Sequence, residues 1–154
     1  MSDVWVSGAN GLLGSALVKQ GYRGFSKEEL DITNYQQLNA ILYKENPKVF
    51  INAAAQAKVD LAEVEKERSF AVNGDAVENL AKTCAALSIR CIHISTDYVL
   101  DYPDHETLME NLTPNPQSTY AKSKRVGELA ALKHGAIVIR VQWMYGCGET
   151  GFFA

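Results

Sequence analysis

The sequence predicts an α/β fold, with a doubly wound parallel sheet of about six strands in the middle of a three-layer sandwich. Short apolar runs rich in β-branched residues alternate with longer stretches that repeat at helical spacing, which is typical of βαβ units. Each helical stretch is long enough for a right-handed crossover. Because a length of 154 residues suits one core, we expect residues 1–154 to fold as a single domain.

The expected strands are short and apolar, and the expected helices fill the gaps between them. Strands are placed near Asp3 to Ser7, Tyr22 to Phe25, Val49 to Asn52, Ile89 to Ser95 and Ala136 to Val141, with a brief extended piece at Leu30 to Ile32. Helices are placed at Gly11 to Lys19, Tyr35 to Glu45, Ala62 to Leu87 with a break near Glu67, and Tyr120 to Lys133. The segment Leu100 to Ser118 is rich in proline and asparagine and has neither periodicity, so it predicts a long loop.

Composition and charge exclude several classes of protein. The net charge is −3 and the 15 Lys and Arg residues are scattered, so no basic stripe for nucleic acid is present. No apolar run approaches the roughly 18 residues that cross a bilayer, and the start lacks the pattern of a secretory signal. The three cysteines, Cys84, Cys91 and Cys147, have no paired spacing that would indicate disulfides or a metal site. We expect a cytoplasmic protein that binds a small molecule, without a metal, membrane or nucleic-acid partner.

A glycine-rich turn follows the first expected strand. The segment Ser7 to Gly14 places Gly8, Gly11 and Gly14 where that strand turns into a helix. Glycine there permits a tight turn and lets the backbone approach a pyrophosphate, which would lie at the positive end of the helix dipole. An ordinary glycine-rich turn is the alternative. The strand before and the amphipathic helix after favour dinucleotide binding.

The residues after the second strand bear on the choice of cofactor. An acidic residue about 20 positions beyond the glycines would accept a ribose 2′-hydroxyl and favour NAD(H), and Glu28 and Glu29 lie at that distance. Ser26 and Lys27 lie closer to the strand end and would hold a 2′-phosphate. The sequence leans to NADP(H) and leaves NAD(H) open.

A tyrosine and a lysine one helical turn apart form the candidate catalytic pair. Tyr120 and Lys124 are at i and i+4, so a helix projects both side chains from one face. An ammonium beside a phenol favours the phenolate, so we expect a lowered Tyr120 pKa and proton exchange with a carbonyl or carbinol oxygen. Thr96, at the end of the Ile89 to Ser95 strand, could hydrogen-bond the same oxygen.

The position of these residues along the chain carries more weight than the pair alone, because a Tyr and Lys at this spacing also arise by chance. In an open α/β sheet, ligands bind beyond the carboxyl ends of the strands. The glycine turn and three further segments fall at such ends: Asn52 to Ala55, Ser95 to Tyr98 and Trp143 to Gly146. The sequence therefore predicts one crevice that holds cofactor and substrate together.

The chain resembles the dTDP-4-dehydrorhamnose reductases of the extended short-chain dehydrogenase superfamily over nearly its whole length. The residues that carry the resemblance are Gly8 to Gly14, Leu30 to Thr33, Ile51 to Ala55, Val59 to Glu63, Val72 with Asn73, Ile92 to Val99, Tyr120 to Lys124 with Gly127 and Glu128, and Trp143 to Gly146. The resemblance implies a Rossmann-type NAD(P)-binding domain over residues 1–154 and reduction of a nucleotide-linked 4-keto-6-deoxysugar.

The resemblance also implies roles for single residues. Tyr120 would supply the proton, Lys124 would tune Tyr120 and hold the nicotinamide ribose, and Thr96 would orient the carbonyl. Tyr120, like Lys124, would also contact the cofactor. Further cofactor contacts are expected from Gly8, Asn10, Gly11, Leu12, Leu13, Gly14, Lys27, Asp31, Ile32, Ala53, Ala54, Ala55 and Asn73. Contacts with the sugar are expected from Asp97, Tyr98 and Trp143.

The chain departs from the family in length. Members are almost twice as long and carry a smaller substrate domain after the segment that corresponds to Trp143 to Gly146, so we expect that domain to be absent from these 154 residues. Without it, the strand near Ile137 to Val141 would expose apolar surface that invites a second chain, such as a homodimer partner.

Several residues have a simpler structural interpretation. Trp5 and His93 are expected in the core or sheet, Trp143 equally in the core or at the substrate, and Glu63 to Arg68 on a solvated helix face. Two other functions remain as alternatives to the reductase. One is a non-catalytic nucleotide-binding or regulatory subunit. The other is a nucleotide-sugar epimerase or dehydratase, although dehydratases typically follow the Ser or Thr with Asp-Glu, and here Asp97 and Tyr98 follow Thr96.

Overall fold

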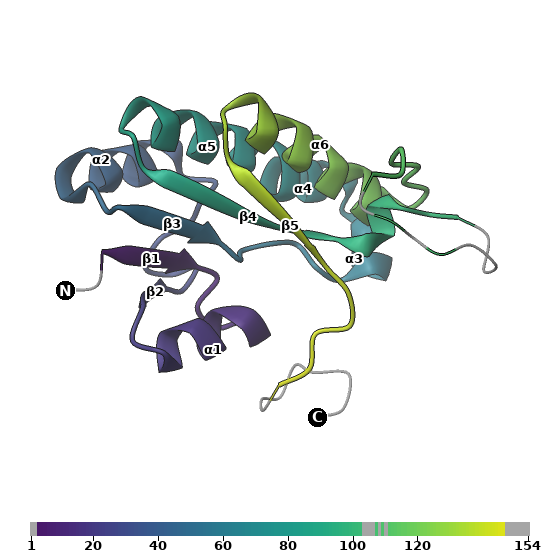
Figure 1. The fold of residues 1–154 in the computed structure, drawn as a ribbon, viewed down its shortest axis with the longest axis horizontal. Helices are drawn as coiled ribbons and strands as arrows, with labels where there is room; N and C mark the ends of the chain where they lie inside the picture. Colours follow the sequence, from purple (N-terminus) through teal and green to yellow (C-terminus); the bar gives the residue numbers. More distant parts are fainter. Residues whose placement is uncertain (1–2, 103–106, 108, 110, 147–154) are drawn as a thin grey trace.

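A parallel β-sheet crosses the molecule, as the computed structural model shows for residues 3–102, 107, 109 and 111–146, which are the residues it describes. Within them the sheet has five strands in the order β2-β1-β3-β4-β5 (Figure 1). The strands are β1 (Val4–Ser7), β2 (Arg23–Phe25), β3 (Val49–Asn52), β4 (Arg90–Thr96) and β5 (Ile137–Val141). All neighbouring pairs are parallel, so the carboxyl ends of the strands meet at one edge.

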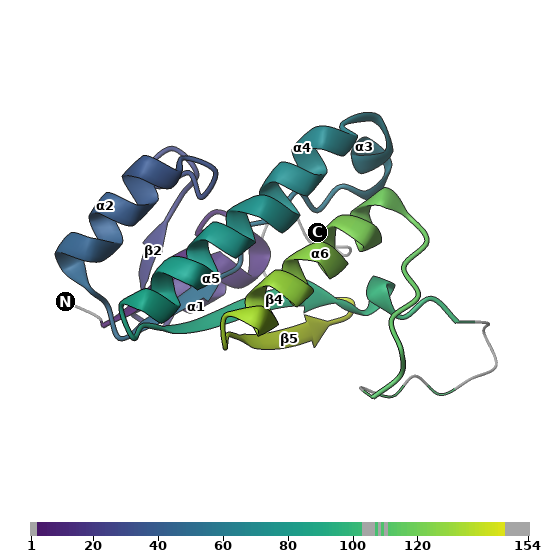
Figure 2. The same ribbon diagram turned by 90° about the horizontal axis from the view of Figure 1, so that it is seen from above.

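Helices lie on both faces of the sheet. On one face lie α2 (Tyr35–Glu45), α5 (Ala76–Ala86) and α6 (Thr119–Lys133), and on the other lies α1 (Leu12–Lys19), next to β1 and β2 (Figures 1 and 2). Two short helices, α3 (Val59–Val64) and α4 (Lys66–Phe70), a π-helix, η1 (Ala71–Asp75), and a 3-10 turn, η2 (Asp97–Val99), complete the order. This arrangement confirms the predicted α/β, Rossmann-type class.

Side-chain caps fix where two of the helices begin. The Asn34 side chain accepts a hydrogen bond from the Gln37 N–H at the start of α2, and Ser118 Oγ accepts one from the Ala121 N–H at the start of α6. Each cap satisfies a backbone donor that the first turn leaves free, which is worth about 1 kcal/mol. The cap at Ser118 places Tyr120 and Lys124 in the first turns of α6.

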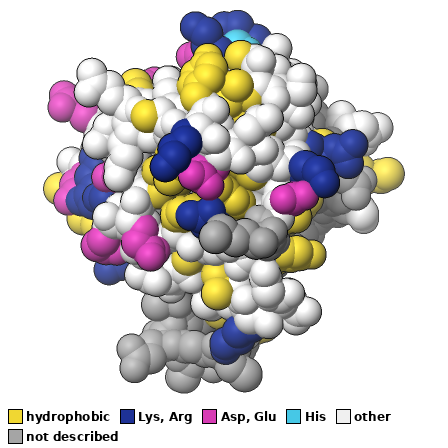
Figure 3. Space-filling view, turned by 90° about the vertical axis from the view of Figure 1, so that its left-hand side faces the viewer, with side chains coloured by type: hydrophobic (Ala, Val, Ile, Leu, Met, Phe, Trp, Pro, Cys, Tyr) yellow, Lys and Arg dark blue, Asp and Glu magenta, His cyan; other side chains and the backbone are white. Residues whose placement is uncertain are grey.

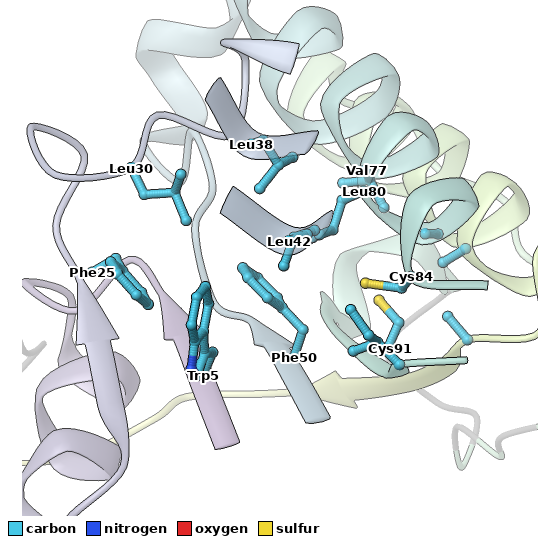
Figure 4. Close-up of a cluster of buried hydrophobic side chains, with 14 residues drawn as sticks. Trp5, Phe25, Leu30, Leu38, Leu42, Phe50, Val77, Leu80, Cys84 and Cys91 are labelled. Carbon is cyan, nitrogen blue, oxygen red and sulfur yellow. The ribbon is translucent and has the colours of Figure 1, made fainter. Parts of the chain in front are cut away.

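The main core lies between the sheet and the α2, α5 and α6 layer (Figure 4). Trp5 is 3% exposed and its ring lies 4.8 Å from that of Phe25, so the core interpretation of Trp5 is confirmed. The labelled side chains of the cluster are Trp5, Phe25, Leu30, Leu38, Leu42, Phe50, Val77, Leu80, Cys84 and Cys91.

The extended piece expected at Leu30 to Ile32 is not a strand. Leu30 and Ile32 are both buried, but their backbone lies in an irregular segment where Leu30 N–H donates to the Ser26 carbonyl and Asp31 Oδ1 accepts from Thr33 N–H. Two buried apolar residues on either side of an aspartate imitate the period of a strand. The described sheet therefore has five strands instead of about six.

The long helix expected from Ala62 to Leu87 is four shorter pieces. The chain leaves helical geometry at Glu65, with φ −100° and ψ 53°, two residues before the predicted break near Glu67. A π-helix then follows α4, and α5 begins at Ala76. Because a π-turn inserts one extra residue, it rotates the faces of the helices on either side of it, and the apolar pattern alone does not reveal it.

Part of the sheet face on the α1 side is open. α1 lies next to β1 and β2, whereas Ile137 and Ile139 on the edge strand β5 are 48% and 43% exposed. The exposed apolar edge that the sequence predicts is therefore present. On the side where the strands begin, acidic and basic side chains of the described residues are interspersed (Figure 3). None of the helices in the described residues is long and apolar enough to cross a membrane.

Candidate active site

The glycine turn brings the β1–α1 backbone against the end of β3. Gly8 has φ +73°, and a Cβ built on it would lie 2.8 Å from both the Ala53 carbonyl oxygen and the Ala54 nitrogen. A Cβ on Gly14 would lie 2.1 Å from the Gly8 oxygen. Gly8 therefore requires glycine for its backbone conformation and for close packing, and Gly14 requires it for close packing. Gly11 is the N-cap of α1 and has no side chain to occupy the first N–H groups of the helix.

A cleft of about 350 Å³ lies beyond this turn, at the carboxyl ends of the strands. It contains nine of the predicted cofactor residues: Gly8, Asn10, Gly11, Lys27, Asp31, Ile32, Ala53, Ala54 and Ala55. It is also lined by Glu28, Leu30, Gln56, Arg68 and Val72. We call it the glycine cleft.

Charged side chains of both signs line the glycine cleft. Lys27 Nζ lies 3.8 Å from Asp31 Oδ2, and Arg68 reaches the cleft from α4. Burial raises the pKa of Asp31, but hydrogen bonds from Thr33 and the charges of Lys27 and Arg68 outweigh it and hold the pKa below its ordinary value. The cleft thus offers two cations to an anionic ligand.

The two acids considered for a ribose hydroxyl differ in their surroundings. Glu29 Oε2 accepts a hydrogen bond from the Ser26 N–H at 2.8 Å, so this carboxylate is bound within the turn from Ser26 to Glu29. Glu28 lines the glycine cleft, and a hydrogen bond from its own backbone holds its pKa below the ordinary value. Of the pair, Glu28 is the acid that a ligand in the cleft would meet.

A second cleft, of about 280 Å³, continues from the glycine cleft and shares Ala53 and Ala55 with it. It brings together the three predicted catalytic residues, Thr96, Tyr120 and Lys124, and the three predicted substrate residues, Asp97, Tyr98 and Trp143. The rest of its lining is Ala57, Val59, Ile94, Ser95, Val141 and Met144. We call it the tyrosine cleft.

Lys124 is buried and turned toward the sheet. The side chain is 2% exposed, and Nζ donates a hydrogen bond to the Ile94 carbonyl at 2.6 Å and lies 3.4 Å from His93 Nε2. Burial lowers its pKa to about 8, against the opposing charge of Glu128. An ammonium held at this point can lose or gain a proton near neutral pH.

The structure corrects one expectation about Tyr120. We expected Lys124 to lower the Tyr120 pKa, but burial raises it, and the nearby Thr96 hydroxyl opposes that shift only in part. Lys124 donates to the Ile94 carbonyl instead of to the phenol. Tyr120 is therefore a protonated phenol at neutral pH, and its ring packs edge-on against Tyr98 with centroids 6.1 Å apart.

Thr96 ends β4 at the floor of the tyrosine cleft. Its hydroxyl donates to Asp97 Oδ1 at 3.1 Å and accepts from the Tyr98 N–H at 3.2 Å, which caps the 3-10 turn. The same hydroxyl faces Tyr120, so a carbonyl oxygen placed between the two would meet the Tyr120 donor, and Thr96 would donate to it by turning its hydrogen away from Asp97. Asp97 and Tyr98 are held next to it by this turn.

Trp143 lies at the rim of the tyrosine cleft and not in the core. It is 50% exposed and has φ +45°, which an L-residue seldom adopts. Residues held in this region cost about 1–3 kcal/mol and cluster at ligand sites. Of the two interpretations of Trp143, the substrate-facing one agrees with this placement.

Besides Tyr120 and Lys124, which line the tyrosine cleft, four predicted cofactor residues lie outside the glycine cleft. Gly14 packs under the turn, and Leu12 and Leu13 line a neighbouring cleft with Met144 to Gly146. The Asn73 side chain is 1% exposed and binds the Gln56 backbone, accepting from its N–H at 2.9 Å and donating to its carbonyl at 3.1 Å. The Asn73 side chain therefore holds the loop that lines the cleft.

Two residues of the Glu63 to Arg68 segment, which we expected on a solvated helix face, make specific contacts. The Glu63 carboxylate accepts hydrogen bonds from the Thr119 N–H and hydroxyl, both at 2.6 Å, and so fixes the start of α6. Arg68 lines the glycine cleft and donates to Glu65 Oε2 at 2.9 Å. In the sequence both belong to one run of charges, which gives no signal of either contact.

Comparison with known proteins agrees with this geometry. A family model described as "RmlD substrate binding domain" matches residues 1–154. The dTDP-4-dehydrorhamnose reductase of Mycolicibacterium smegmatis is 37% identical over 96% of the chain and 47% of its own length. The beta subunit of methionine adenosyltransferase 2 from Bos taurus is 34% identical over 93% of the chain and 47% of its own length.

A solved structure also resembles the chain. The dTDP-4-dehydrorhamnose reductase of Bacillus anthracis in complex with NADP has a TM-score of 0.91 and 32% identity, over 99% of this chain and 57% of that one. The chain thus spans about half the length of the relatives that it matches. Since the family model covers residues 1–154, the chain belongs to the RmlD substrate binding domain family, the family of the dTDP-4-dehydrorhamnose reductases.

Proposed function

We propose that residues 1–154 are the NAD(P)-binding domain of a reductase that acts on a nucleotide-linked 4-keto-6-deoxysugar. The observation that carries this proposal is the meeting of Thr96, Tyr120 and Lys124 in a cleft that continues into the glycine cleft. The names of the Mycolicibacterium and Bacillus relatives support the substrate class. The half of the relatives' length outside the match would supply the rest of the sugar site.

A dinucleotide fits the residues of the glycine cleft. The start of α1 at Gly11 has no side-chain cap and lines the cleft, which suits a pyrophosphate. Lys27 and Arg68 would hold a 2′-phosphate, which favours NADP(H), while Glu28 leaves NAD(H) open as a second cofactor. When bound, the nicotinamide would supply the hydride. The protein itself would position the two reactants and deliver the proton.

Tyr120 would act as the general acid. Reduction of a carbonyl leaves an oxygen that needs a proton, and burial keeps the Tyr120 phenol in its protonated form by raising its pKa. Thr96 would orient the carbonyl by a hydrogen bond, and Lys124, with a pKa near 8, would supply positive charge beside the reacting oxygen. The protonated tyrosine therefore suits the reductive direction.

The test is turnover of dTDP-4-dehydrorhamnose with NADPH by a reductase that contains residues 1–154 together with its sugar-binding part, and by its Tyr120→Phe variant. The variant keeps the ring and loses the proton, so we expect turnover to fall by about 10²-fold or more while NADPH binding persists. Tyr43→Phe, on the 62% exposed Tyr43 of α2, is the matched control and should leave turnover unchanged. Equal turnover in both variants would contradict the proposal.

A regulatory subunit is the second candidate function. The observation that favours it is the 34% identity to the beta subunit of methionine adenosyltransferase 2, a chain named as a subunit of a different enzyme. A protein of this kind would bind NADP(H) in the same glycine cleft without turning over a keto sugar. Turnover above background that requires Tyr120 would reject this candidate.

An epimerase or dehydratase would return its cofactor to the starting state in each cycle. Asp97 and Tyr98 after Thr96 depart from the Asp-Glu that dehydratases typically carry. The stoichiometry of NADPH consumption separates the two classes. We expect one NADPH oxidised for each product formed, whereas product formed without net oxidation would indicate an epimerase or dehydratase.

A further inference from the structure

A row of buried polar side chains crosses the sheet beneath the tyrosine cleft. Ser7, Asn52 and His93 are register partners on β1, β3 and β4, and each is 0% exposed. Ser7 Oγ donates to Asn52 Oδ1 at 2.8 Å, and Asn52 Nδ2 lies 3.2 Å from His93 Nδ1. The row ends at Lys124, whose Nζ lies 3.4 Å from His93 Nε2.

The backbone fixes the orientation of the Asn52 amide. The Ala54 N–H, which can only donate, points at Asn52 Oδ1 with a distance of 3.3 Å. Turning the amide over would set its NH2 group against that N–H. The amide oxygen therefore stays on the Ala54 side, and the NH2 group stays on the His93 side, where it donates to Nδ1.

His93 is then held as a single tautomer. Burial, together with the neighbouring charge of Lys124, lowers the pKa of His93 to about 2, so the ring is neutral throughout the physiological range. A neutral imidazole carries one N–H. Because Nδ1 accepts the hydrogen bond from Asn52, the hydrogen is on Nε2 and points toward Lys124.

This tautomer limits the acceptors that Lys124 has inside the fold. An ammonium has three donors, and the Ile94 carbonyl takes one at 2.6 Å. A bare Nε2 would take a second, but an Nε2–H cannot accept. Of the other ionisable groups, Asp97, Tyr98 and Tyr120 line the tyrosine cleft with Lys124. Glu128, on the same helix, is bound by Arg125 and by Arg140 of β5.

We infer that His93 is a positioning residue: its Nε2–H tautomer, fixed from Ala54 through Asn52, denies Lys124 a second acceptor inside the sheet and leaves two ammonium hydrogens for the tyrosine cleft. Its meaning for catalysis rests on the proposed function. Those two hydrogens are the ones that hydroxyl groups of a bound ligand would accept.

The first test is the protonation of His93 in the unmodified chain, measured by long-range ¹H–¹⁵N NMR correlations with ¹⁵N-labelled histidine. The chain has three histidines, so assignment by a His134→Gln variant and a His105→Gln variant is direct. We expect His93 to carry its hydrogen on Nε2, without titration between about pH 5 and 8. A hydrogen on Nδ1, or a titration in that range, overturns the inference.

The second test reverses the tautomer. Asn52→Asp replaces the donor by an acceptor, so we expect the hydrogen to move to Nδ1, Nε2 to accept from Lys124, and the Lys124 titration midpoint to rise by about one pH unit. Asn52→Leu, which adds no charge and keeps the branched shape, should produce a fraction of Nδ1–H and a smaller rise in the Lys124 midpoint. Ser7→Ala is the control, because it leaves the Ala54 and Asn52 contact intact and should change neither quantity.

A reversed tautomer with an unchanged Lys124 midpoint would overturn the link between the two residues. The NMR readouts use neither cofactor nor substrate. A chain that shows the expected tautomer but reduces no keto sugar would therefore contradict the proposed function alone. A chain that turns over the sugar with the hydrogen on Nδ1 would contradict the inference about His93 alone.

Discussion

The Glu63 carboxylate accepts two hydrogen bonds from Thr119, one from its backbone N–H and one from its hydroxyl, each at 2.6 Å. Thr119 is the first residue of α6 and precedes Tyr120 directly. A contact between α3 and α6, 56 residues apart in the chain, therefore fixes the point from which Tyr120 and Lys124 project. The carboxylate also lies at the positive end of the α6 dipole, which adds to its attraction.

Glu63→Gln should lower the thermal midpoint of unfolding at neutral pH, because the amide replaces a charged acceptor. The hydrogen bonds from Thr119 hold the Glu63 pKa below its ordinary value, so its contribution to stability is present above that ordinary value and is lost as pH falls through the folded pKa. Melting curves of both proteins should therefore converge below about pH 4. Glu67→Gln on α4 is the control and should melt like the parent at every pH.

Lys124→Met should stabilise the fold while it impairs catalysis. The folded pKa of Lys124 is about 8, below its ordinary 10.5, so burying the protonated lysine lowers the free energy of unfolding at neutral pH. We expect a gain on the order of 2 kcal/mol at pH 7, measured by urea unfolding. The penalty fades as pH rises from 8 towards 10.5, so the gain should shrink over that range. A variant less stable than the parent at pH 7 would contradict this account.

Arg68→Ala should weaken binding of NADPH more than that of NADH. Arg68 lines the glycine cleft beside Lys27, and a guanidinium suits a 2′-phosphate that only NADPH carries. We expect about a tenfold loss of NADPH affinity by calorimetry and an unchanged NADH affinity. Arg90→Ala is the matched control, because Arg90 begins β4 and lies at the end of the strand away from the clefts. An equal loss for both cofactors would mean that Arg68 contacts a part they share.

Ile139→Lys should reduce self-association of the chain. Ile139 is 43% exposed on the edge strand β5, whose exposed apolar side chains can pack against a second copy. We propose such a homodimer, and sedimentation velocity should show it dissociating in the variant. Val64→Lys, on the 81% exposed Val64 of α3, is the control and should sediment like the parent. A parent chain that is monomeric at all concentrations would reject the homodimer.

The sequence predicts local structure well where one element supplies the signal. The glycine turn, Ala53 and Thr96 each lie at the end of a strand. The sequence reveals these ends as apolar runs that stop at small or polar residues. The spacing of Tyr120 and Lys124 places both on one face of a helix, and the structure brings both to the tyrosine cleft with Thr96. These predictions depend on period and order, which the sequence contains directly.

The sequence does not predict contacts that depend on how distant elements pack. Glu63 and Arg68 lie in one charged run, yet one fixes α6 and the other reaches the glycine cleft, because the chain breaks at Glu65. The direction of Lys124 is a second case. The hydrogen bond to the Ile94 carbonyl, and not the spacing from Tyr120, decides where its ammonium points, and burial of Tyr120 itself raises the Tyr120 pKa.

The measurement that tests the central claim most directly is a calorimetric titration of the folded chain with NADPH, repeated with a Gly11→Asp variant. Aspartate is a favourable N-cap, and the one close neighbour of a Cβ on Gly11 would be the Gly8 oxygen at 3.3 Å, which a small shift accommodates. Helix α1 should therefore survive, while a negative charge enters the pyrophosphate position. We predict saturable binding by the parent and none by the folded variant. No binding by the folded parent, or equal affinity in the variant, would contradict the assignment of the glycine cleft to NADP(H).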